Sequence, residues 1–359
     1  MIERGRYTSG RIALGNLSAS IAALRRRRAA GAGFDDLLAL SQLLVARGDL
    51  LGRIADHDRA ERVAAEAVGS SGDAAGALYL RARLAGRFHR FDEAGALLDR
   101  ALAAGHPRRE VEAEQTALLQ ATGRYSEALA LRAWWAKEDP GIHTLGALAS
   151  LLAEMDQWTA AEAAYAAALE ADTGVSPLPC GQLLFEWGVS AMRRGALGRA
   201  EALFGELDAV LPQHVPARGH RAEVALARGQ LDVALALITP LLDISDDPEY
   251  RATHAEILAA RGESLAAASE AERAAAAYER LLARRPEAYA DHAAAFFLGI
   301  GNRPQRAFAL ASLNWRLRDT ARSRSLLARA RRAAEATEGR TPHVTHGGRS
   351  PRAGSEKIA

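Results

Sequence analysis

The stretch that decides the fold is residues 123–128, which read Gly-Arg-Tyr-Ser-Glu-Ala. Its final alanine belongs to a column of alanines that recurs along the chain with steps of 34, 34, 33, 39, 34, 40 and 33 residues. The column consists of Ala60, Ala94, Ala128, Ala161, Ala200, Ala234, Ala274 and Ala307. A repeat of about 34 residues is the length of two short helices and their turns.

Other columns keep the same period. Small residues stand twelve positions before the alanines, where two helices are expected to touch: Gly48, Ala82, Thr116, Ala149, Gly188, Ala222 and Ala295. Mostly larger residues stand four positions after them: Ala64, Leu98, Arg132, Tyr165, Phe204, Ile238, Tyr278 and Ala311. Gly123, Gly195, Gly229 and Gly262 are predicted to break the chain between the two helices of a repeat.

These segments resemble the tetratricopeptide repeat family over residues 41–319, best at 91–101, 123–128 and 184–212. The resemblance implies an all-α, right-handed α-solenoid of about eight helix-turn-helix repeats. Residues 1–40 are expected to form an amphipathic, basic segment, 320–336 a capping helix, and 337–359 a disordered tail. Arg132 and Asn314 depart from the family pattern, because their columns are usually apolar.

Two steps between repeats are long. The 39-residue step contains Val175, Pro177 and Pro179, and it predicts a proline-rich connection that also holds Cys180. The 40-residue step contains residues 263–272, which are rich in alanine and glutamate and are expected to lengthen the helices of repeat seven.

Composition agrees with a helical scaffold. Apolar residues make up 49% of the chain, aromatic residues 6%, and the net charge is +2, so a whole-chain attraction to nucleic acid is not indicated. The single cysteine excludes a disulfide within the chain, and no apolar stretch is long enough for a membrane span. A cytoplasmic location is expected, with a degenerate export signal at residues 1–28 as the alternative.

Sequence patterns typical of metal sites or catalytic sites are weak in this chain. His343 and His346 have a two-residue spacing, but a solvated tail explains them better than a metal site. Cys180 is more typical of a small structural residue than of a nucleophile. No metal or cofactor is expected, and the chain is not expected to be an enzyme. A remote alternative is an enzyme in repeats seven and eight that uses Asp291 and His292.

In the resembling family, the first helix of each repeat lines a concave groove. Carried over residue by residue, the resemblance implies these partner-binding positions: Tyr79, Arg83, Arg87, Phe185, Met192, Arg193, Glu223, His292 and Phe296. Some of these aromatic side chains could instead pack between repeats. The sequence therefore predicts a scaffold or adaptor that binds an extended peptide or helix of a partner protein. The alternative is a regulatory or ligand-sensing module that acts with a separate effector.

Overall fold

The computed structural model describes residues 6–31, 33–71 and 74–338, and every regular element in these ranges is a helix. The helices are α1 (Gly10–Ala29), α2 (Phe34–Leu51), α3 (Ile54–Ser71), α4 (Ala75–Arg87), α5 (Phe91–Ala103), α6 (Arg108–Ala121), α7 (Tyr125–Glu138), α8 (Ile142–Glu154), α9 (Trp158–Glu170), α10 (Pro177–Arg193), α11 (Leu197–Val210), α12 (Val215–Ala227), α13 (Leu231–Ile238), α14 (Leu241–Ile244), α15 (Pro248–Ala260), α16 (Ser264–Arg284), α17 (Pro286–Leu298), α18 (Pro304–Leu317) and α19 (Ala321–Glu338).

Successive helices pack as pairs, which confirms the predicted all-α solenoid of tandem helix pairs. The pairs are α2/α3, α4/α5, α6/α7, α8/α9, α10/α11, α12/α13, α15/α16 and α17/α18. The predicted alanine column lies on the second helix of each pair, and each of these alanines is at most 2% exposed. Their small side chains let the two helix axes approach, while the larger residues one turn later fill the space to the next pair. The hand of the superhelix and the exact number of repeats stay predictions.

One residue with positive φ separates the two helices of each pair. The predicted glycines fill four of these positions, and the eight residues are Gly52, His89, Gly123, Asp156, Gly195, Gly229, Gly262 and Asn302. A left-handed residue ends the first helix and turns the chain back along it. Asparagine and aspartate tolerate this conformation better than most side chains do.

The late repeats differ from the alignment in a defined way. Helix α16 has 21 residues, and Ala267 stands as far from the turn residue Gly262 as Ala234 does from Gly229. The extra residues therefore lengthen α16 continuously, and Ala274 lies two turns farther along the same buried face. Ala295 is exposed and does not join the small-residue column, because the turn after α17 is two residues longer than that after α10.

Helix α1 ties the chain's beginning to its middle. Leu17, Ile21 and Leu24 are buried, and α1 packs against both α2 and α10. Ahead of it, the Tyr7 hydroxyl donates a 2.8 Å hydrogen bond to Asp172, in the connection that follows α9. The predicted segment 1–40 thus contains an ordered helix, and the first helix of the array already begins at Phe34.

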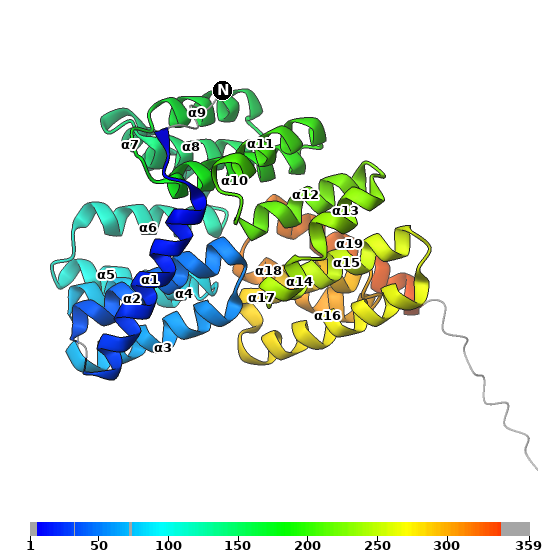
Figure 1. Cartoon of the computed structure of the whole chain (residues 1–359), viewed down its shortest axis with the longest axis horizontal. Helices are drawn as coiled ribbons and strands as arrows, with labels where there is room; N and C mark the ends of the chain where they lie inside the picture. Colours follow the sequence, from blue (N-terminus) through cyan, green and yellow to red (C-terminus); the bar gives the residue numbers. More distant parts are fainter. Residues whose placement is uncertain (1–5, 32, 72–73, 339–359) are drawn as a thin grey trace, which may run out of the picture.

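The solenoid curves until its early and late repeats meet, and Figure 1 shows α3 and α4 beside α16 and α17. Arg285 pairs with Asp58 and Glu61, which lie more than 220 residues earlier in the chain. Asp246 accepts a 2.7 Å bond from the Ile54 backbone N–H at the start of α3, where a carboxylate also complements the helix dipole. The contacts of Arg285 and of Asp246 with α3 therefore enclose the concave side between the early and the late repeats.

Helix α19 packs against α18 and α17, with Leu326 and Ala330 buried, at the place of the predicted capping helix. Thr320 and Ser323 exchange hydrogen bonds at its start, which satisfies backbone groups that the helix leaves free. The predicted tail from residue 339 onward lies outside the described residues. Cys180 does not lie in the proline-rich connection: it is fully buried in α10, because that helix already begins at Pro177.

Candidate functional site

Four cavities follow the concave side, and the first helices of the pairs supply most of their lining. The N-terminal cavity of about 420 Å³ lies among α2, α4 and α6, and the central cavity of about 590 Å³ lies among α2, α4, α10, α12 and α17. The repeat-three cavity of about 410 Å³ lies among α6, α7, α8 and α10, and the C-terminal cavity of about 360 Å³ among α12, α15, α17 and α19. Arg318 lines three of the four cavities, and Ala121 lines two of the same three and the N-terminal cavity, so the cavities adjoin one another.

Most of the sequence-predicted groove residues lie on this surface. The residues that line a cavity are Arg83, Arg87, Phe185, Arg193, Glu223, His292 and Phe296. Tyr79 instead stacks on His106, with ring centroids 4.1 Å apart, and Met192 packs beside the main hydrophobic core. Phe296 is 5% exposed and packs on Tyr278, so it forms a cavity wall more than a free anchor. The partner-binding role of all nine residues stays a prediction.

In the central cavity, several charged groups neutralise one another. Asp49 is bonded by Arg87 and lies 3.3 Å from His57. His220 lies 2.9 Å from Glu223, which lines the neighbouring C-terminal cavity. Burial opposes ionisation of Asp49, but the bonds from His57 and Arg87 outweigh it and hold its pKa below the usual value. Arg87 and Glu223 are among the groove residues predicted from the sequence, whereas their partners Asp49, His57 and His220 were not predicted.

Asp291 and His292 both face the C-terminal cavity. His292 lies 3.3 Å from Glu249 and 3.9 Å from Asp291, and Arg318 lies 3.3 Å from Asp291. Asp291 and Glu249 raise the pKa of His292 to about 10, so the imidazole is protonated at neutral pH. A base must be free to accept a proton, whereas this ring already carries one. The arrangement suits an ion-pair network.

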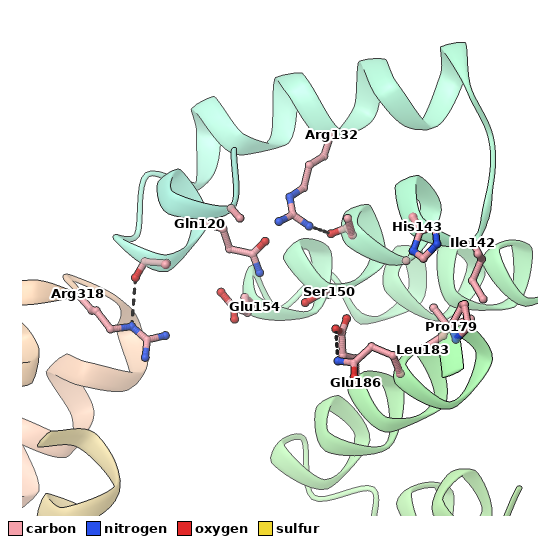
Figure 2. Close-up of a pocket in the computed structure, with 15 residues that line it drawn as sticks. Gln120, Arg132, Ile142, His143, Ser150, Glu154, Pro179, Leu183, Glu186 and Arg318 are labelled. Atoms are coloured by element: carbon pink, nitrogen blue, oxygen red, sulfur yellow. Dashed lines mark hydrogen bonds between the residues drawn. The ribbon is translucent and has the colours of Figure 1, made fainter. Parts of the chain in front are cut away.

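The repeat-three cavity has a different character, which Figure 2 shows at close range. Arg132 of α7 extends into the gap from one side, and Glu154 of α8 and Glu186 of α10 lie on the other side. The Arg132 guanidinium donates to the Ala147 carbonyl, and Gln182 donates a 2.9 Å bond to Glu186. The signal for this cavity was present in the sequence as the charged residue in an apolar column.

Among the described ranges of the chain, no group of three or more His, Cys, Asp or Glu side chains could hold a metal ion. His343 and His346 lie outside those ranges. Likewise, none of the helices in the described part is long and apolar enough to cross a bilayer.

Comparisons with known proteins give one family match within the helix array. Residues 191–257, from the end of α10 into α15, match the family model described as Tetratricopeptide repeat. A tetratricopeptide repeat protein from Parabacteroides merdae ATCC 43184 is 18% identical and has a TM-score of 0.44, over 68% of this chain and 92% of that one. The human IFIT1 dimer with m7Gppp-AAAA is 15% identical with a TM-score of 0.47, over 85% of this chain and 72% of that one. A search of curated proteins finds no match.

Proposed function

Because this chain contains tetratricopeptide repeats, we propose that it is a non-catalytic scaffold or adaptor that binds a partner protein on its concave surface. The observation that carries the proposal is the position of the predicted groove residues. Seven of the nine line adjoining cavities, although they come from four different helices between α4 and α17. Arginine and aromatic side chains gathered in a concave surface are the types that anchor partners.

The volumes of the cavities favour an extended peptide of the partner over a helix as the bound segment. A helix with its side chains is about 10 Å or more across, so three turns occupy roughly 1,300 Å³. The largest of the four cavities has a volume of about 590 Å³. An extended peptide can instead pass from one cavity to the next and place single side chains in each.

The ionised groups also suit peptide recognition. Arg193 and Arg83 are exposed on the concave side, and Arg83 lies 3.0 Å from Glu114. A peptide carboxylate could exchange with such a surface pair at little cost, because exposed ion pairs contribute only about 0–1 kcal/mol. The predicted cytoplasmic location and the predicted absence of a nucleic-acid partner stay predictions.

Affinity purification with a charge-reversed concave surface tests the proposal. The test variant is Arg83→Glu with Arg193→Glu, and the control is Arg62→Glu with Leu265→Ala, two exposed positions on the second helices α3 and α16. We expect the control to recover the wild-type partner and the test variant to lose it. Equal recovery of every partner by both variants would refute binding on the concave surface.

A further inference from the structure

Repeat three lacks the apolar side chain that fills the other pairs. Arg132 stands in the column that holds Tyr165, Phe204 and Ile238 in the next three repeats, and those three are at most 1% exposed. A guanidinium cannot fill this position as a fully buried side chain, because burying its charge without a partner is costly. The result is the repeat-three cavity of about 410 Å³ between α6, α7, α8 and α10.

Buried polar atoms in this cavity lack partners. Gln120 is 8% exposed, its side chain lines the cavity, and its Oε1 atom makes no hydrogen bond. The Nε atom of Arg132 is buried and also makes none. A buried polar atom left without a partner costs about 1–3 kcal/mol, so two such atoms at one cavity indicate groups that a ligand would satisfy.

The charged side chains around the cavity also make no direct contact with one another. Among the described residues, Arg132, Glu154 and Glu186 form no ion pair within 4.0 Å, whereas Arg87 and Asp49 pair in the central cavity. Glu186 accepts only the side-chain amide of Gln182, and Glu154 faces the Tyr125 hydroxyl. One cation and two carboxylates therefore face the same space, and they attract one another across it without forming a direct ion pair.

We propose that the repeat-three cavity binds a small zwitterion that carries a carboxylate and an ammonium group. The Arg132 guanidinium would hold the carboxylate, since its planar donors match carboxylate oxygens. Glu154 and Glu186, on the opposite wall, would hold the ammonium group. Gln120 Oε1 would accept a further N–H of the ligand. A free α-amino acid and a short peptide share this chemistry, and the proposal goes beyond the scaffold function, because it needs no partner protein.

The ionisation of the cavity supports this geometry. Burial raises the pKa of Glu186 and lowers the pKa of Arg132, so the surroundings of each side chain disfavour its charged form. An ammonium group beside Glu186 would reverse the first shift, and a carboxylate beside Arg132 would reverse the second. Binding should therefore release a proton where Glu186 is partly protonated.

Isothermal titration calorimetry tests the proposal with defined probes. The probes are the twenty free amino acids, glycylglycine and trialanine, each beside its N-acetylated or C-amidated form. We expect at least one unblocked probe to bind and both blocked forms to bind at least tenfold more weakly. Binding by free amino acids alone, or by peptides alone, tells which source of the zwitterion fits.

Variants assign the binding to this cavity. Arg132→Gln and Glu186→Gln should each weaken binding at least tenfold, whereas Lys137→Gln on the same helix α7 and Glu170→Gln at the end of α9 should not. Arg132→Leu restores the apolar column, and we expect it to raise the melting temperature and abolish binding. The proposal is overturned if no probe binds the wild type, or if Arg132→Gln and Glu186→Gln, both folded by circular dichroism, bind as the wild type does.

Discussion

Gly188 of α10 lies directly against the Phe204 ring of α11, and replacing it by alanine tests the packing within the helix pair. A Cβ atom at this position would lie 2.5 Å from Cε1, 2.8 Å from Cδ1 and 2.9 Å from Cζ of Phe204. The Phe204 ring is fully buried, and the rings of Phe185 and His220 lie beside it. The ring therefore has little room to retreat.

The expected loss of stability in Gly188→Ala follows from a comparison with a second helical glycine that has open space around it. Gly205 lies on α11, and a Cβ atom there would meet nothing within 4 Å. Gly205→Ala should stabilise the protein by about 0.5–1 kcal/mol, because alanine loses less backbone entropy in a helix than glycine does. Gly188→Ala has the same backbone gain but overpacks the contact by about 1–3 kcal/mol. The two variants should therefore differ by about 1–3 kcal/mol.

Urea unfolding followed by circular dichroism at 222 nm measures the difference. Phe204→Leu in the Gly188→Ala background should cost less than the two single changes together, because the smaller side chain makes room for the new methyl group. If Gly188→Ala is as stable as Gly205→Ala, the contact between α10 and the Phe204 ring is wrong, and with it the assignment of the small-residue column.

Three further predictions concern the turns, the pH dependence and the closed shape. Gly229 has a φ of 72° and open space around it, so Gly229→Ala should lower the free energy of unfolding by about 1 kcal/mol through backbone strain alone, seen as a lower urea midpoint. Burial lowers the pKa of His214 from 6.5 to about 4, so the unfolded chain takes up a proton first as the pH falls. This difference contributes up to about 3 kcal/mol to the free energy of unfolding above pH 6.5, and the contribution is lost as the pH falls toward 4. His214 Nδ1 accepts the Ala217 backbone N–H, so His214→Asn should keep this helix cap and remove that part of the pH dependence in melts between pH 4 and 7; an unchanged dependence would contradict the assignment. Arg285→Ala removes the two ion pairs of Arg285 with α3 and should increase the radius of gyration in small-angle X-ray scattering. The Arg284 side chain is more exposed, so Arg284→Ala should change the radius less. Equal radii for Arg285→Ala and the wild type would show that the ion pairs of Arg285 do not hold the closed shape.

The local architecture was accessible from the sequence, because it depends on side chains at fixed spacing. The buried alanines, the turn glycines and the lengthened α16 all follow from residue type and period. The positive φ of His89 and of Asp156 was not predicted, since these residue types indicate a left-handed turn less clearly than glycine does. The extra turn residues after α17 shifted the expected column by the same amount, which is why Ala295 was misplaced.

The closure of the solenoid could not be predicted. It depends on small rotations between successive pairs, which accumulate over the array and leave no mark in any one repeat. The ion pair between Arg285 and Asp58 joins two charged residues that are largely covered only because the early and late repeats meet, and no column of the repeat marks either of them. Arg132, by contrast, does depart from the family pattern, so the sequence alone marks the repeat in which the cavity lies.

The link between Arg285 and Asp58 also bears on how the chain folds. An array whose ends are free can nucleate anywhere and fray from either terminus, because each unit depends only on its neighbours. Here the first units are also supported by residues 227 positions later in the chain. Such distant contacts raise the contact order, and the search that brings them together slows folding. We therefore expect the N-terminal units to gain full protection from hydrogen exchange only after the C-terminal ones have folded onto them.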